Sequence, residues 1–160
     1  MLNRIIIPIF IALILIALQF IVIPFISVKF IIPNIVLIFV VLYTLRYGQI
    51  SGSLFGFFIG FFFDIASAGF IGSGMFAFTL ASFIAGYFHK EDYDEVIFSI
   101  KLFLPIMFLL SSLFFIIYSV LGMQSIEVQL NYSIIIYSLL CGFYTTVISL
   151  VIFLLPRDSL

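Results

Sequence analysis

Apolar residues run through this chain almost without interruption. Six stretches, at residues 5–26, 30–45, 49–63, 70–88, 96–121 and 132–155, are dominated by Ile, Leu, Val and Phe, and only short polar connections separate them. A helix needs about 20 apolar residues to cross the hydrocarbon core of a bilayer. We therefore predict an all-α integral membrane protein with six transmembrane helices, which form a single polytopic domain over residues 1–160.

The composition excludes several classes of protein. The chain is 66% hydrophobic and 8% charged, and its mean hydropathy is +1.46. A compact soluble enzyme needs far more polar surface, and a disordered chain needs low hydrophobicity. Six lysines and arginines cannot form a basic face for nucleic acid.

Residues for catalysis or metal binding are scarce in the sequence. Cys141 and His89 are the only members of their residue types, so neither a cysteine cluster nor a multi-histidine site can form. The acidic run at 91–95 belongs to a polar connection. The sequence shows no combination of nucleophile, general base and general acid that is typical of an active site. We expect no enzyme activity and no cofactor.

The second and third stretches are short and leave two alternatives. One continuous segment across Arg46 would give five spans but would place a guanidinium in mid-membrane, which is costly. Tyr47-Gly48-Gln49 is typical of a tight turn, in which glycine supplies a positive φ. We therefore favour a helical hairpin, with Pro33 in the first turn of the second span.

The positions of Lys and Arg predict the topology. With six spans and both termini in the cytoplasm, the outer connections are 27–29, 64–69 and 122–131. Lys29 alone then lies outside, and the other basic residues lie inside: Arg4, Arg46, Lys90, Lys101 and Arg157. This bias indicates a multi-pass membrane protein with both ends inside.

The third stretch contains a face of small residues. Gly52, Gly56 and Gly60 are four residues apart and share one side of a helix. Ala77, Ala81 and Ala85 form a similar ridge in the fourth stretch. Small ridges let two backbones approach closely. They either pack the third and fourth spans on each other or leave one ridge open for a partner helix.

Asp64 continues the glycine spacing and is the first acidic residue of the chain. An ionisable residue near membrane depth suggests a function, but no second buried titratable group is available for a proton relay. The alternative is an Asp at the outer boundary that caps the next helix through its N-terminal N–H groups. Arg46 is expected to snorkel at the hairpin turn or to pair with an anionic lipid or partner.

Hydroxyl and amide side chains inside the apolar stretches can form hydrogen bonds between helices. Gln19, Ser111, Ser112, Thr145, Thr146 and Ser149 are the candidates. Such bonds contribute under about 1 kcal/mol each on average in membrane proteins.

Residues 33 to 87 resemble the bacterial rod shape-determining protein MreD family. The matching positions are Pro33 and Asn34, Leu45 and Arg46 with Gly48, the glycine face with Asp64, the glycines Gly69, Gly72 and Gly74, and the pair Gly86 and Tyr87. The family usually has Pro-Asp where this chain has Pro33-Asn34.

The resemblance implies a non-enzymatic scaffold in the bacterial inner (cytoplasmic) membrane, which belongs to the cell-elongation machinery that makes peptidoglycan. The partners it implies are an MreC-like single-span protein, an MreB-like actin filament, and the glycosyltransferase and penicillin-binding transpeptidase of elongation. Membrane lipids are also expected contacts, whereas nucleic acid is not.

The six-span layout is also similar to that of the substrate-binding subunits of energy-coupling-factor transporters. This gives an alternative function, binding of a small solute such as a vitamin. Those subunits dock through alanines four apart on the first span, whereas Ala12 and Ala17 are five apart here. A third hypothesis is a lipid-handling protein whose groove accepts a polyprenyl carrier.

Overall fold

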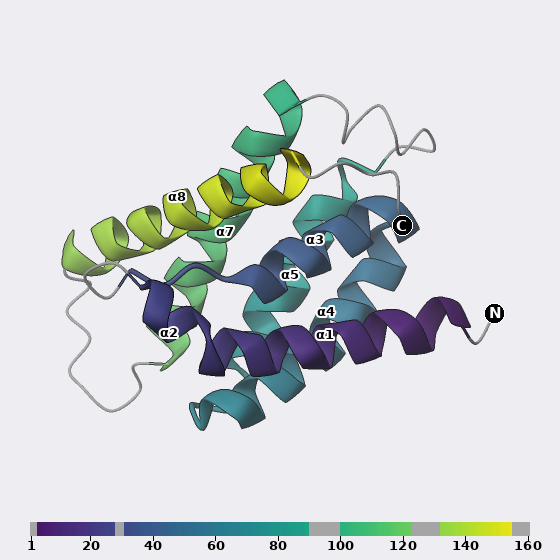
Figure 1. Ribbon diagram of the computed structural model, residues 1–160, viewed down its shortest axis with the longest axis horizontal. Helices are drawn as coiled ribbons and strands as arrows, with labels where there is room; N and C mark the ends of the chain where they lie inside the picture. Colours follow the sequence, from purple (N-terminus) through teal and green to yellow (C-terminus); the bar gives the residue numbers. More distant parts are fainter. Residues whose placement is uncertain (1–2, 28–30, 90–99, 123–131, 155–160) are drawn as a thin grey trace.

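The computed structural model describes residues 3–27, 31–89, 100–122 and 132–154, and this part of the chain is all-α (Figure 1). Its seven helices are α1 (Asn3–Ile21), α2 (Ile23–Ile26), α3 (Ile35–Tyr47), α4 (Gln49–Ser67), α5 (Ser73–Gly86), α7 (Ile100–Gly122) and α8 (Tyr132–Leu154). Helices α4, α7 and α8 contain segments that are long and apolar enough to cross a membrane, and α1, α3 and α5 are shorter apolar helices. By helix length and hydropathy, the chain is a multi-pass membrane protein.

The helix boundaries differ from the expected spans at four places. The first stretch is divided at Val22 into α1 and α2. Pro33 lies two residues before α3 and not in its first turn, because residues 32–34 are not helical. Helix α4 continues to Ser67, so Asp64 is helical and does not belong to an outer loop. Helix α5 is shorter at both ends than the stretch 70–88.

Some expected features fall outside the described residues. These are Lys29, Lys90 and Arg157, the connection at 123–131, and residues 96–99 and 155 at the ends of the last two predicted spans. The predicted turn at Gly48 is confirmed: α3 ends at Tyr47, α4 begins at Gln49, and Gly48 has φ 86°.

Helix α3 is the centre of the helix packing. It contacts α1, α4, α5, α7 and α8, and Figure 1 shows it lying between α1 and α8. Seven of its 13 residues are buried, on more than one face: Val36, Leu37, Ile38, Val40, Val41, Thr44 and Leu45. A helix that is apolar and buried on several sides is typical of a membrane-protein interior.

A non-helical segment leads into α3, and polar side chains from other helices hold it. The Gln19 side chain of α1 donates from Nε2 to the Pro33 carbonyl at 2.7 Å and accepts at Oε1 from the Ile35 N–H at 3.0 Å. The Asn34 N–H donates to the Thr145 hydroxyl of α8 at 3.1 Å, and Asn34 Oδ1 caps α3 by accepting from the Leu37 N–H at 2.9 Å. Non-helical backbone at membrane depth needs such partners, because lipid offers none.

Helices α7 and α8 form a tight pair. Gly142 lies so close to Ser112 that a side chain at Gly142 would overlap the Ser112 hydroxyl and backbone. The Ser111 hydroxyl lies 3.0 Å from the Gly142 carbonyl oxygen. The expected bridging is therefore confirmed for Gln19, Ser111 and Thr145. It is wrong for Thr146 and Ser149, whose hydroxyls bond to carbonyls of their own helix, and for Ser112, whose hydroxyl has no partner among the described residues.

Replacing Gln19 with Met keeps the length of the side chain and removes both of its hydrogen bonds. We expect the variant to be less stable, because the buried Pro33 carbonyl and Ile35 N–H lose their partners, at about 1–3 kcal/mol for each unsatisfied group. Thermal unfolding in detergent measures the loss. Leu18→Met, at the exposed neighbouring position, is the matched control, and equal melting of the two variants would contradict this role of Gln19.

Candidate functional site

The expected site residues from α4 and α5 meet inside the chain. Every residue of both ridges is buried: Gly52, Gly56, Gly60, Ala77, Ala81 and Ala85. A Cβ at Gly56 would lie 2.8 Å from the Phe78 carbonyl oxygen, and one at Gly60 would lie 2.6 Å from Met75 Cα. Gly56 and Gly60 therefore pack α4 on α5, where they meet Phe78 and Met75 and not the alanines. Because both ridges are buried, neither is open for another helix among the described residues.

The ends of the glycine face contact other parts of the structure. A side chain at Gly52 would overlap Thr44 of α3. Gly86, the last residue of α5, lies against Gln49, the first residue of α4. The glycines of the resemblance therefore bring α4 close to its two neighbours along the chain, to the Thr44 side chain of α3 and to the backbone of α5.

Asp64 caps the N-terminus of α5. Its carboxylate accepts from the backbone N–H groups of Gly72, Gly74 and Met75 at 2.8, 2.8 and 3.2 Å, and its exposed fraction is 1%. The Ser73 hydroxyl lies 3.4 Å from its Oδ1. The capping alternative for Asp64 is confirmed, and the capping carboxylate is buried inside the chain.

Gly72 and Gly74 are required by this cap. Gly72 precedes α5 with φ 117°, and a side chain at Gly74 would overlap the Asp64 carboxylate. Helix α5 has no local side-chain cap, so Asp64 of the preceding helix satisfies N–H groups that would otherwise be orphaned. The positive end of the helix dipole also favours the carboxylate.

Hydrogen bonds also hold the opposite end of the α4–α5 pair, where α4 begins and α5 ends. The Gln49 side chain donates from Nε2 to the Phe83 carbonyl at 3.0 Å, near the C-terminus of α5. His89 Nδ1 lies 2.6 Å from the Leu45 carbonyl near the end of α3. Because a carbonyl can only accept, this nitrogen carries the proton.

Other expected site residues lie around these contacts. Arg46 is exposed in the last turn of α3, where a cation suits the helix dipole, and its guanidinium carbon is 5.7 Å from the centre of the Tyr47 ring. Tyr87 is exposed after α5, and its ring contacts Phe83. Gly69 follows Ala68, which has a left-handed conformation at the end of α4.

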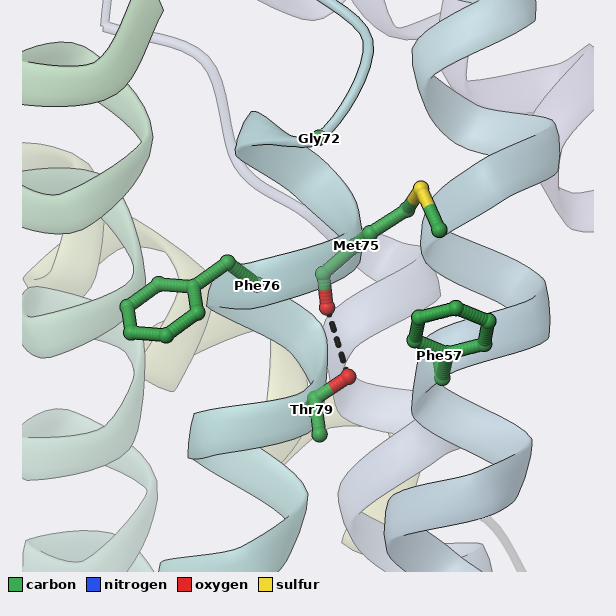
Figure 2. A pocket seen from close by; sticks show the side chains of 5 residues that line it. All are labelled: Phe57, Gly72, Met75, Phe76 and Thr79. Carbon is green, nitrogen blue, oxygen red and sulfur yellow. Dashed lines mark hydrogen bonds between the residues drawn. The ribbon is translucent and has the colours of Figure 1, made fainter.

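The outer surface of the α4–α5 pair has a shallow hollow of about 300 Å³ (Figure 2). Phe57 of α4 and Met75 of α5 lie on its two sides, and the Thr79 hydroxyl donates to the Met75 carbonyl at 2.6 Å. The lining is almost wholly apolar, and its hydroxyl is already bound within α5. This hollow offers no chemistry beyond contact with an apolar group.

A larger cavity of about 430 Å³ lies near the cap made by Asp64, and no sequence pattern predicted it. Its wall combines residues from α1, α2, the segment before α3, α4, α5 and the connection that precedes it, α7 and α8. Examples are Gln19, Phe63, Phe70, Tyr118 and Tyr137. Because each helix contributes few residues, none of them shows a recognisable pattern along the chain.

Within the described ranges, no group of three or more His, Cys, Asp or Glu side chains lies close enough to hold a metal ion. Comparison of the chain with models of known protein families, with curated proteins and with solved structures found no match.

Gly56→Ala tests how tightly α4 packs on α5. We expect a loss of about 1–3 kcal/mol of stability, as for overpacking, because the new Cβ meets the Phe78 backbone, which cannot move aside as a side chain can. Thermal unfolding in detergent is the measurement. Gly122→Ala is the matched control, since no atom lies within 4 Å of a Cβ there; similar losses in both variants would disprove the close approach.

Asp64→Asn tests the cap. The change places an amide NH₂ where a carboxylate oxygen now accepts backbone N–H groups, so donors face donors in a buried site. We expect a loss of about 1.5–3 kcal/mol, the range for a charged hydrogen bond, and increased hydrogen exchange at residues 72–75. Asp64→Ala should be about as unstable as Asp64→Asn, whereas a fully stable Asn variant would show that the carboxylate is not needed.

Proposed function

We propose that the chain is a non-enzymatic scaffold of the bacterial cell-elongation machinery, with six spans, both termini in the cytoplasm and an MreD-like role. The observation that carries the proposal is the use made of the buried polar side chains. Asp64, Gln19, Asn34 and Thr145 all join separate helices or cap them. Polar side chains that only join and cap helices make the helix bundle rigid, and a rigid bundle is suited to binding other membrane proteins.

The resemblance supports the same function through the residues on which it depends. Pro33 and Asn34 lie in the braced segment before α3, and Gly48 forms the turn between α3 and α4. The glycine face, Asp64 and Gly86 fix α4 against α5. The quoted motifs are thus the residues that determine the helix arrangement, which is what a family of scaffolds needs to preserve.

The proposed partners belong to the elongation machinery. They are an MreC-like single-span protein, an MreB-like filament in direct or indirect contact, and the glycosyltransferase and transpeptidase of elongation. The buried ridges leave the outer helix surfaces for such contacts. Exposed apolar side chains cover α1, α2 and α8, including Phe10, Ile21, Phe25, Phe143 and Val151. In the membrane these surfaces meet lipid or another helix.

Co-expression with the single-span elongation protein of the same organism tests the proposal. We expect the two to co-purify from detergent, and deletion of the chain to convert rods to round cells. An unrelated single-span protein of similar length is the control for nonspecific capture. Absence of co-purification together with normal rod shape would refute the scaffold function.

The alternative, a solute-binding transport subunit, is favoured by one observation, the cavity of about 430 Å³. This volume is within the usual range for small-molecule sites, about 300–1,000 Å³. Thermal-shift measurements with water-soluble vitamins separate the two functions. Stabilisation by one vitamin, without co-purification of an elongation protein, would favour the transporter.

A further inference from the structure

The cavity lies where several helices end. It is bordered by the last turns of α1 and α7, by Pro24 of α2, by the segment before α3, and by the connection that Asp64 ties to α5. Helix α1 packs on α3 and α4, whereas α7 packs mainly on α5 and α8. The cavity occupies the space that these two packing arrangements leave at this end of the bundle.

Aromatic rings form most of the wall. Phe63 of α4 contacts Phe20 of α1 at 5.1 Å, Tyr118 of α7 at 5.8 Å and Phe114 of α7 at 6.5 Å, measured between ring centroids. Phe114 and Tyr118 are stacked at 5.7 Å. Rings that support one another in this way make a firm apolar surface.

The lining is uncharged. None of its residues is Asp, Glu, Lys, Arg or His, so a charged group inside would remain without a counter-ion at a high cost. The polar side chains are amides and hydroxyls, and the most deeply buried of these are Gln19, Asn34 and Ser73. The occupant is therefore neutral over the part that enters, and mostly apolar.

Asn34 offers a hydrogen-bond donor to that occupant. Its exposed fraction is 2%, and its Oδ1 is fixed by the Leu37 N–H, which identifies the other atom as the amide nitrogen. Within the described residues no group accepts from this Nδ2. The fully buried side-chain atoms without a partner in the described part of the chain are Ser112 Oγ and Ser138 Oγ. Asn34 Nδ2 is not one of them, so it keeps access to the cavity that Asn34 lines, where a carbonyl oxygen of a ligand would accept from it.

The rim of the cavity is apolar and exposed. Phe20 and Phe70 are partly exposed, and Gly122 is exposed at the end of α7. In a multi-pass membrane protein, such a rim between apolar helices adjoins hydrocarbon chains. The side chains that line an empty apolar cavity have no dispersion contacts on that side. A lipid acyl chain that enters the cavity restores these contacts.

We propose that this cavity binds one acyl chain of a neutral or zwitterionic membrane lipid, with the ester carbonyl of that chain accepting from Asn34 Nδ2. The aromatic wall formed by Phe63, Phe114 and Tyr118 holds the hydrocarbon part. The proposal is independent of the scaffold function, because it needs neither an elongation partner nor a particular cell shape.

Photocrosslinking tests the site. The protein is reconstituted in vesicles of phosphatidylethanolamine and phosphatidylglycerol that contain a phosphatidylcholine with a diazirine midway along one acyl chain. After illumination, peptide mass spectrometry locates the crosslinks. We expect them to concentrate on peptides that contain Phe20, Phe115 and Tyr118, and an excess of methyl palmitate to reduce them.

Ser119→Phe fills the cavity from α7 and should reduce these crosslinks by roughly tenfold, about 1.4 kcal/mol of binding free energy. Ser51→Phe makes the same change at an exposed position of α4 outside the cavity and should leave them unchanged. Thermal unfolding of both variants verifies that they are folded. If Ser119→Phe is unstable, competition by methyl palmitate in the unmodified chain decides the outcome.

Two results would overturn the proposal. One is an even spread of crosslinks over the exposed helix faces that neither methyl palmitate nor Ser119→Phe reduces at the cavity. The other is competition at the cavity by a water-soluble neutral aromatic such as indole but not by methyl palmitate, which would identify a solute site. Neither result bears on co-purification with an elongation protein, so the two proposals fail separately.

Discussion

The carboxylate of Asp64 is the interaction on which the arrangement of α4 and α5 depends. A short helix that begins inside a membrane protein has N–H groups that lipid cannot satisfy. Helix α5 begins after a glycine and has no cap of its own, so its first N–H groups bind a carboxylate one helix earlier in the chain. The glycine ridge then needs only to let the two backbones meet, because the cap has already aligned their ends.

Much of the fold could be predicted from local signals. The apolar stretches, the glycine turn at Gly48 and the spacing of the small residues each depend on residues that are neighbours in sequence. The division of the first stretch at Val22 and the non-helical segment around Pro33 were not predicted, because hydropathy does not distinguish a helix from a braced extended segment. The brace itself comes from Gln19 and Thr145, and Thr145 is 111 residues away from Asn34.

The candidate site was predicted only where it depends on residues that are neighbours in sequence. Asp64 continues a regular spacing, so it could be singled out, and capping was one of the two roles considered. Its burial could not be foreseen, since α4 extends beyond the end of its most apolar part. The roles of Gln49 and His89 as caps were missed because a side chain that binds a carbonyl of another helix leaves no pattern in its own segment. The cavity was missed because its wall is assembled from most of the chain.

The bond between His89 and Leu45 has a consequence for the order in which the chain is built. Leu45 is near the end of α3, but the imidazole that binds its carbonyl follows 44 residues later. During synthesis, the ribosome must therefore complete α4 and α5 before the end of α3 acquires this partner, and N-terminal segments emerge first. The Gln49 side chain likewise waits for the Phe83 carbonyl. The hydrogen bonds among the three helices are therefore complete only after residue 89 has been synthesised.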